Sequence, residues 1–168
     1  MTGIKLLLFD VDGVLTDGSI IVHADGTESK TFNIRDGAGI VWAQKAGLAV
    51  GLLSARLADA TSVRATQLGT TIVVQGAADK LAGYEQILAD QGLTDDQVGY
   101  MGDDLQDLPV IRRAGFSAAP ADAAPEVRAA VTWVSASGGG RGAARECIEH
   151  VLRAQGLWRP AIADYLGS

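Results

Sequence analysis

The sequence predicts an α/β protein in which a central, mainly parallel sheet lies between two layers of helices. The first observation is that short apolar segments alternate with segments of helical periodicity along the chain. The second is the glycine after several helical segments, as at Gly47, Gly69 and Gly92, because glycine often follows a helix C-terminus. The third is the composition of 48% hydrophobic and 20% charged residues over 168 positions, which is typical of a globular chain with one core.

The individual elements follow from apolar periodicity and from the residues that begin and end each segment. Strands are expected over residues 4–9, 48–53, 71–74, 98–101, 116–118 and 131–134. Helices are expected over residues 36–46, 57–68, 80–91, 105–114 and 142–154, with a further short helix that begins at Pro125. Parallel strands need such crossovers, so helices should cover both faces of the sheet in a Rossmann-like three-layer sandwich.

One hairpin interrupts this alternation after the first strand. Residues 19–23 and 27–33 flank Ala24-Asp25-Gly26, a turn sequence typical of β-hairpins. We therefore expect a β-hairpin flap over about residues 17–33, inserted in the first crossover. The chain has no linker and no room for a cap domain, so residues 1–168 should form a single domain with a tail from about residue 156.

Charge, cysteine content and the N-terminus narrow the class of function. The formal charge of -6 and the pI of about 4.8 argue against a nucleic-acid backbone as the main partner. The single cysteine, Cys147, allows no intrachain disulfide and lies on the apolar side of a predicted helix. Neither a signal peptide nor a membrane span is recognisable, so we expect a soluble cytoplasmic protein.

Asp10-Val11-Asp12-Gly13 follows the first apolar strand directly. Residues i and i+2 of a strand point to the same face, so Asp10 and Asp12 should project together from its carboxyl end. Open α/β sheets bind ligands at that end, and two neighbouring carboxylates favour a cation such as Mg²⁺. The alternative is an acidic turn, because Asp-Gly is a common turn pair.

A second acidic cluster follows the strand over residues 98–101. It contains Asp103, Asp104 and Asp107. Asp103 should share the sheet edge with Asp10 and complete an oxygen-rich metal site. The alternative is a helix N-terminus at which aspartates interact with the macrodipole.

Two further segments supply groups for binding an anion at the same edge. Ser54-Ala55-Arg56 follows a strand and opens a helix, where a hydroxyl and backbone N–H groups can bind an anion. Ser54 can equally be an N-cap. Lys80 begins the next helix, where a cation opposes the macrodipole unless an anion lies nearby; the alternative is a solvated surface lysine.

The motifs of this chain resemble those of the haloacid dehalogenase superfamily of phosphatases. The four motifs are Asp10-Val11-Asp12-Gly13-Val14, Ser54, Lys80 and Gly102-Asp103-Asp104. Within the superfamily, the chain resembles the capless branch that hydrolyses 3-deoxy-D-manno-octulosonate 8-phosphate, from about residue 5 to residue 156. The finer similarity lies in residues 14–18, 32–37, 102–109 and 138–146. Ser54-Ala55-Arg56 departs from the Thr-Gly-Arg that is more frequent in the branch, but it keeps the hydroxyl.

The resemblance implies a phosphomonoester hydrolase that forms an aspartyl-phosphate. Asp10 would be the nucleophile, and Asp12 would protonate the leaving group and then activate water. Mg²⁺ would bind the Asp10 and Asp103 carboxylates and the backbone carbonyl of Asp12. Mn²⁺ or Co²⁺ are possible substitutes, because a site built from oxygen ligands accepts several hard divalent ions.

The other motif residues would bind the substrate or orient these groups. Phosphate oxygens would be bound by Ser54, Ala55 and Lys80. The metal shell and Lys80 would be oriented by Asp104 and Asp107. The carboxylate of a sugar acid would pair with Arg56 and Arg64, because arginine binds carboxylates through two parallel hydrogen bonds. The alternative for Arg64 is a surface ion pair.

The resemblance also implies partners. A capless member would form a homo-oligomer, most simply a tetramer, in which the flap packs against neighbours and roofs the adjacent site. Residues 138–142 and the tail would close over a site too, unless the glycine run is only a flexible loop. No nucleic-acid or membrane partner is expected.

Several functions remain open at this point. The leading one is hydrolysis of the eight-carbon sugar-acid phosphate in the pathway to the lipopolysaccharide inner-core sugar. A nine-carbon substrate, such as N-acylneuraminate or deaminoneuraminate 9-phosphate, would need the same chemistry. A non-catalytic interaction module is a different class, which the complete set of motif residues disfavours. A phosphotransferase usually needs a cap to exclude water, and the length leaves no space for one.

Overall fold

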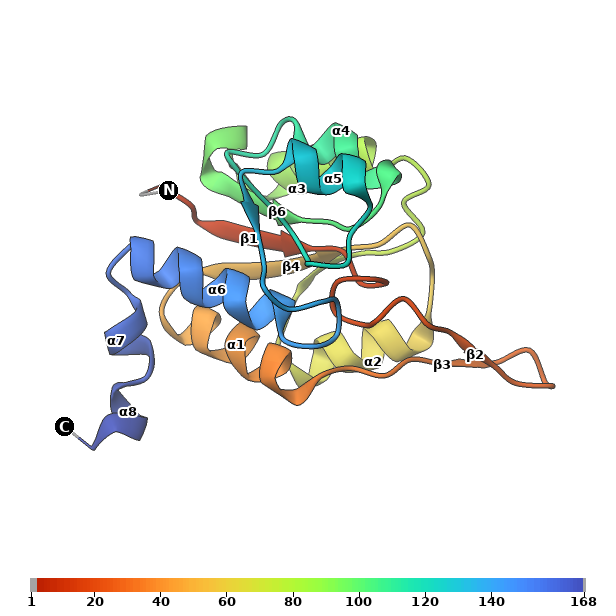
Figure 1. Cartoon of the computed structure of the whole chain (residues 1–168), viewed down its shortest axis with the longest axis horizontal. Coiled ribbons are helices and arrows are strands. Elements are labelled where there is room, and N and C mark those ends of the chain that lie inside the picture. Colours follow the sequence, from red (N-terminus) through yellow and green to blue (C-terminus); the bar gives the residue numbers. More distant parts are fainter. Residues whose placement is uncertain (1–2, 168) are drawn as a thin grey trace.

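A six-stranded parallel sheet forms the centre of the molecule (Figure 1). The computed structural model describes residues 3–167, and its strand order is β5-β4-β1-β6-β7-β8. The strands are β1 (Leu6–Phe9), β4 (Ala49–Leu53), β5 (Ile72–Val74), β6 (Val98–Met101), β7 (Phe116–Ala119) and β8 (Trp133–Val134). Every neighbouring pair in this sheet is parallel, so the predicted α/β class is confirmed.

Helices cover both faces of the sheet (Figure 1). One face carries α1 (Ile34–Lys45), α2 (Asp59–Gln67) and α6 (Ala143–Ala154). The other carries α3 (Lys80–Gln91), α4 (Leu108–Ile111) and α5 (Pro125–Ala130), with the 3₁₀-helices η1 (Asp95–Gln97) and η2 (Leu105–Asp107). Between β1 and α1 the described chain inserts a hairpin and no cap domain. Within residues 3–167, no helix has both the length and the apolar character that a membrane crossing requires.

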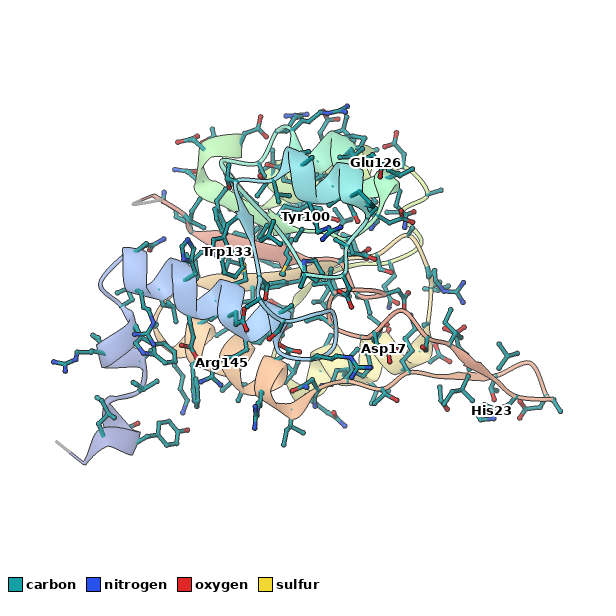
Figure 2. The ribbon with its side chains drawn as sticks, viewed as in Figure 1. Asp17, His23, Tyr100, Glu126, Trp133 and Arg145 are labelled. Atoms are coloured by element: carbon teal, nitrogen blue, oxygen red, sulfur yellow. The ribbon has the colours of Figure 1, made fainter. Side chains whose placement is uncertain are left out.

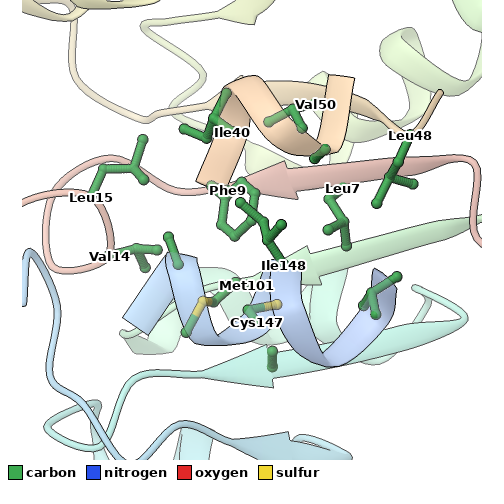
Figure 3. Close-up of a cluster of buried hydrophobic side chains, with 14 of the residues drawn as sticks. Leu7, Phe9, Val14, Leu15, Ile40, Leu48, Val50, Met101, Cys147 and Ile148 are labelled. Atoms are coloured by element: carbon green, nitrogen blue, oxygen red, sulfur yellow. The ribbon is translucent and has the colours of Figure 1, made fainter. Parts of the chain in front are cut away.

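Alternate residues of β1 face the two helical layers. Leu7 and Phe9 lie in one cluster of buried side chains with Ile40 of α1 and Ile148 of α6 (Figure 3). Leu6 and Leu8, which alternate with them, belong to a second cluster, which α3, α4 and α5 complete. A strand that is buried on both faces needs a continuous apolar sequence, which explains the run of three leucines and a phenylalanine.

The direction of the strand order reverses at β1. Strands β4 and β5 extend the sheet on one side of β1, whereas β6, β7 and β8 extend it on the other. The crossover after β1 leads to one side of the sheet and the crossover after β6 to the other, so they diverge at the carboxyl ends of these two neighbouring strands, where open α/β sheets bind ligands.

The expected hairpin is present, but its strands are shorter than predicted. β2 (Ile21–Val22) and β3 (Glu28–Ser29) pair antiparallel over two residues each, instead of over residues 19–23 and 27–33. Ile21 and Val22 are 55% and 74% exposed, so no core packing extends the ladder beyond the turn. The hairpin projects from the body of the protein as an arm (Figure 1).

One predicted helix is divided in the structure, and several others differ from their predicted bounds by one or two residues. The helix expected over residues 105–114 is divided into η2 and α4. Asp104 and Asp107 form a capping box around the first turn, and Pro109 suits only the first turn of a new helix. The helix expected over residues 57–68 begins at Asp59, after the N-cap residue Ala58.

The tail is folded, which the sequence analysis did not predict. It forms α7 (Trp158–Ala161) and α8 (Ala163–Leu166), which lie away from the carboxyl edge of the sheet (Figure 1). The ring of Trp158 meets that of Trp42 on α1 edge-on, with centroids 5.9 Å apart. Trp42 Nε1 also donates a hydrogen bond to the Tyr165 hydroxyl at 3.3 Å. These contacts hold the tail against α1 of its own chain.

The core between the sheet and α6 generates a stability prediction. Leu152 of α6 is fully buried in the first cluster, whereas Leu57 is 77% exposed. Leu152→Ala should lower the free energy of unfolding by about 2–5 kcal/mol, because it removes buried methyl groups and leaves a cavity. The matched Leu57→Ala should change it by less than about 0.5 kcal/mol. Urea unfolding monitored by circular dichroism measures both, and equal losses would contradict the packing described.

Candidate active site

Asp10 lies at the carboxyl end of β1, one residue beyond the strand. Its backbone N–H donates to the carbonyl of Met101 at the end of β6, at 3.0 Å, which fixes it between the two strands. Its carboxylate is buried; Oδ1 accepts from the N–H of Val11 at 2.6 Å and Oδ2 from Lys80. Burial raises the pKa of Asp10 to about 6, although the positive charge of Lys80 acts to lower it.

Lys80 is a buried cation between two carboxylates. It is the first residue of α3, whose N-cap Asp79 accepts from the N–H groups of Leu81 and Ala82, so the helix start is fixed independently of Lys80. Nζ lies 2.5 Å from Asp10 Oδ2 and 2.5 Å from Asp107 Oδ1. Burial would lower the pKa of Lys80, but the two carboxylates outweigh burial and raise it. The surface-lysine interpretation is therefore wrong.

Asp107 connects Lys80 to the loop after β6. Its Oδ1 also accepts from the Tyr100 hydroxyl at 2.5 Å, and its Oδ2 accepts from the N–H groups of Asp103 and Asp104 at 2.9 and 3.1 Å. Tyr100 lies on β6 near the middle of the molecule (Figure 2). The sequence analysis missed Tyr100, although a hydroxyl in an otherwise apolar buried strand was a signal that a polar partner lies nearby.

Asp103 completes an acidic group that fits a divalent cation. One ligand oxygen from each of Asp10, Asp103 and Asp107 lies within 4.8 Å of the others. Asp103 Oδ1 is buried and has no hydrogen-bond partner within the described part of the chain. Burial, together with the charges of Asp10 and Asp107, raises the pKa of Asp103 to about 7. Oxygen ligands, excess negative charge and an orphaned buried oxygen are what a hard cation such as Mg²⁺ would satisfy.

Asp12 does not follow the strand geometry predicted for it. β1 ends at Phe9, and the next residues form a turn in which Leu15 and Thr16 donate their N–H groups to the carbonyl of Val11. Strand alternation therefore does not extend to Asp12. Its carboxylate contacts Lys30 of the flap at 2.7 Å, a residue that the sequence analysis did not identify.

Ser54 is buried at the carboxyl end of β4, but it does not open a helix as predicted. Three residues separate it from the N-cap Ala58, and the segment with Ala55 is a loop. The Ser54 hydroxyl accepts from the N–H of Arg56 at 3.2 Å, and the Ser54 carbonyl accepts from that of Ala77 at 3.1 Å. Ser54 is therefore held at the sheet edge by hydrogen bonds of the loops around it. It is not held by the N-terminus of a helix.

The two candidate arginines have different surroundings. Arg56 lies near the acidic groups, with Nε 3.7 Å from Asp12 Oδ2 and a guanidinium nitrogen 2.7 Å from Glu28 Oε2. Arg64 lies on α2, stacks over the Phe32 ring at 5.9 Å and donates to Gln67 Oε1 at 3.3 Å. The structure therefore brings Arg56, and not Arg64, to Asp12 within one chain.

Asp104 is exposed, and its hydrogen bonds stabilise the loop after β6. Its Oδ1 accepts from the N–H of Leu105 at 2.8 Å, and its own N–H donates to Asp107. Asp104 is therefore a capping residue here, one step removed from the buried acidic group.

Glycines allow the loops around this site to approach one another. A Cβ at Gly13, where φ is +86°, would lie 2.0 Å from Asp103 Oδ2. A Cβ at Gly139 would lie 1.9 Å from the carbonyl oxygen of Gly13, and the N–H of Gly140 donates to the carbonyl of Val14 at 2.9 Å. The glycine run after residue 137 therefore packs on the turn that carries Asp12, which argues against a flexible loop without a role.

The start of this glycine run is held by Glu146, and this contact predicts a pH-dependent stability. The Glu146 carboxylate accepts from the hydroxyls of Ser135 and Ser137, each at 2.6 Å, and from the N–H of Ala136 at 2.9 Å. Burial acts to raise the pKa of Glu146, but these hydrogen bonds outweigh burial and lower it. A carboxyl group whose pKa is lower in the folded state stabilises that state at a pH above its pKa in the unfolded state. This contribution is lost as the pH falls through the pKa in the folded state.

Glu146→Gln should therefore lower the free energy of unfolding by about 1–3 kcal/mol at pH 7. The difference from the wild type should shrink below about pH 4.5, the ordinary value for glutamate. Glu126→Gln, on exposed α5 (Figure 2), is the matched control and should change little. Denaturant unfolding at a series of pH values measures this, and a difference independent of pH would contradict the prediction.

Comparison with known proteins agrees with this geometry. Residues 49–146 match the family model of the haloacid dehalogenase-like hydrolases. The 3-deoxy-D-manno-octulosonate 8-phosphate phosphatase of Yersinia pestis is 43% identical over 152 residues, which are 90% of this chain and 81% of that protein.

Two solved structures share the fold over nearly the whole chain. The enzyme of the same name from Moraxella catarrhalis, in complex with magnesium, phosphate and a KDO molecule, superposes with a TM-score of 0.94 at 35% identity. The alignment covers 98% of this chain and 94% of that one. The cobalt-bound deoxy-D-mannose-octulosonate 8-phosphate phosphatase from Haemophilus influenzae superposes at 0.89 with 39% identity, over 92% and 91% of the two chains. The matched family model and these relatives show that the chain belongs to the haloacid dehalogenase-like hydrolases.

Proposed function

We propose that this phosphatase hydrolyses 3-deoxy-D-manno-octulosonate 8-phosphate to the free sugar acid and phosphate. The observation that carries the proposal is the cluster of buried Asp10, Lys80 and Asp107 with the half-buried Asp103 at the topological switch point. It combines a carboxylate nucleophile, a cation for the phosphoryl oxygens and an acidic site for a metal. Phosphoryl transfer depends mainly on such positioning and charge stabilisation.

Asp10 is the proposed nucleophile, and Asp12 the proposed acid and base. The Asp10 carboxylate is held by Val11 and Lys80, so one oxygen can be directed at phosphorus. Attack forms an aspartyl-phosphate, and Asp12 donates a proton to the departing sugar oxygen. Asp12 then takes a proton from the water that releases phosphate. Ser54, the N–H of Ala55 and Lys80 are the proposed ligands of the phosphoryl oxygens.

Asp10 and Asp103, with the backbone carbonyl of Asp12, are the residues that we propose hold Mg²⁺. Asp107 positions Asp103 through its backbone N–H and neutralises Lys80. The bound ion would shield the negative nucleophile from the negative phosphate. The magnesium-bound and cobalt-bound relatives support a divalent ion, and Mn²⁺ or Co²⁺ should replace Mg²⁺.

The sugar-acid substrate is proposed from the relatives, which are named for the eight-carbon phosphate. Arg56 is half exposed beside Asp12 and is the better placed of the two arginines for its carboxylate. Arg64 would reach a substrate only in a neighbouring copy. With this substrate, we propose that the protein acts in the cytoplasm, in lipopolysaccharide inner-core sugar synthesis.

We also propose that the chain is a single domain and assembles as a homo-oligomer, most simply a tetramer. Ile21 and Val22 expose apolar side chains on a two-stranded arm, which would be marginal in isolation. The arm would pack on neighbouring copies and cover their sites.

The first activity prediction concerns the substrate and the nucleophile. With Mg²⁺ present, phosphate release should be fastest from 3-deoxy-D-manno-octulosonate 8-phosphate, slower from N-acetylneuraminate 9-phosphate, and detectable from p-nitrophenyl phosphate. Asp10→Asn should reduce kcat by about 10⁴-fold or more on all three, because the nucleophile is lost. Asp90→Asn, on the exposed side of α3, is the matched control. Preference for the nine-carbon acid would change the substrate, and no release from any would reject the proposed function.

A second prediction concerns the metal. Asp103→Asn should weaken Mg²⁺ binding by at least about 10–100-fold, because it replaces an anionic oxygen ligand by a neutral amide. Isothermal titration of chelator-treated protein measures the affinity without turnover. Asp90→Asn should bind Mg²⁺ as the wild type does, and unchanged binding by Asp103→Asn would exclude this site.

A further inference from the structure

Asp12 lies in a closed ring of alternating charges that reaches from the catalytic turn to the flap. Lys30 Nζ lies 2.7 Å from each oxygen of Asp12 and 4.0 Å from Glu28 Oε1. Glu28 Oε2 accepts from Arg56 at 2.7 Å, and Arg56 Nε lies 3.7 Å from Asp12 Oδ2. The ring therefore joins three segments that are distant in the sequence.

Lys30 is the best-buried member of this ring. Its side chain is 0% exposed, against 18% for Asp12, 21% for Glu28 and 48% for Arg56. A lysine on a two-stranded arm would ordinarily extend into water, because ordering its long side chain costs conformational entropy. The Lys30 side chain instead lies buried at the end of β3, with both carboxylate oxygens of Asp12 in reach, so this contact joins the base of the arm to the turn of Asp12.

The arm presents Lys30 and Glu28 together. Glu28 belongs to β3 and Lys30 follows that strand by one residue. Their i, i+2 spacing is that of neighbours on one face of an extended chain, and both reach the same network. Glu28 Oε1 is buried and has no hydrogen-bond donor in the described residues, so its contact with Lys30 is electrostatic.

We infer that Lys30 is a positioning residue for the acid and base Asp12, an inference that rests on the proposed function. The turn that carries Asp12 is not part of the sheet, and the contacts of its carboxylate come from Lys30 and Arg56. Lys30 holds both oxygens and therefore fixes the direction in which the carboxylate faces the leaving group. The flap is thus a part of the acid–base machinery as well as a surface element.

A positioning role of Lys30 can be separated from a structural one by how the loss of activity in a Lys30 variant varies with the leaving group of the substrate. Nitrophenolate departs without a proton, phenolate needs more help, and a sugar alkoxide needs a proton most. Loss of a residue that acts through Asp12 should therefore reduce activity least on p-nitrophenyl phosphate, more on phenyl phosphate and most on the sugar-acid phosphate. The ratio kcat/KM reports the steps up to the departure of this group, so it isolates proton donation from the later release of phosphate.

Lys30→Met, which keeps the length and removes the charge, is the test variant. Its kcat/KM should fall by about 10²-fold on the sugar-acid 8-phosphate, less on phenyl phosphate and less than about threefold on p-nitrophenyl phosphate. Lys30→Arg should restore most of the loss, because it keeps a cation. Lys45→Met, exposed at the end of α1, is the matched control and should behave as the wild type.

Several outcomes would overturn the inference. Equal losses on all three substrates, with a lower melting temperature, would show that Lys30 only stabilises the flap. A loss confined to the sugar-acid phosphate, with phenyl and p-nitrophenyl phosphate equally active, would make Lys30 a substrate ligand. If Lys30→Met does not fold, Lys30→Arg and Lys30→Gln carry the same comparison. A wild type inactive on every substrate would reject the proposed function itself, whereas an active wild type with an unselective Lys30→Met rejects only the role of Lys30.

Discussion

The carboxylates of Asp10 and Asp107 lie on either side of the Lys80 ammonium inside the protein, and Asp103 lies beside them. Charges buried this deeply persist only when they are paired, because the interior solvates them poorly. One lysine cannot balance three carboxylates, so the group retains negative charge. Burial is the main reason that the pKa values of Asp10 and Asp103 are raised, and the neighbouring carboxylates add to it. This excess of negative charge is what a divalent cation would balance.

The surrounding architecture holds these charges at short range. Each charged residue follows a strand or begins a helix, and backbone hydrogen bonds fix the connecting turns. Glycines at positions 13 and 139 let one turn lie against another without side chains between them. Preorganised groups of this kind do not have to move when charge develops during a reaction, which is the main source of electrostatic stabilisation in enzymes.

Asp10 and Asp12 are only two residues apart, but their surroundings differ. Asp10 is enclosed beneath the loops with Lys80, whereas Asp12 lies at the surface of the site with a lysine from the flap. Two carboxylates in different environments can take different chemical roles, one as a nucleophile and one as an acid. In this chain the flap supplies part of that difference, which links the position of an exposed arm to the chemistry.

The sequence by itself determined the α/β class, the parallel sheet and the sheet edge at which Asp10, Ser54, Lys80 and Asp103 meet, because hydrophobic periodicity and strand ends are local properties. It also indicated the family. Only the tertiary structure decided that Lys80 is a buried bridge, that Tyr100 supports Asp107, and that Lys30 reaches Asp12. These pairs depend on contacts between residues that are not neighbours in the sequence, and the local sequence around a lysine or a tyrosine does not say which residue it will meet. The folded tail was missed for that reason too: Trp158 becomes a structural contact only when α1 presents Trp42 to it.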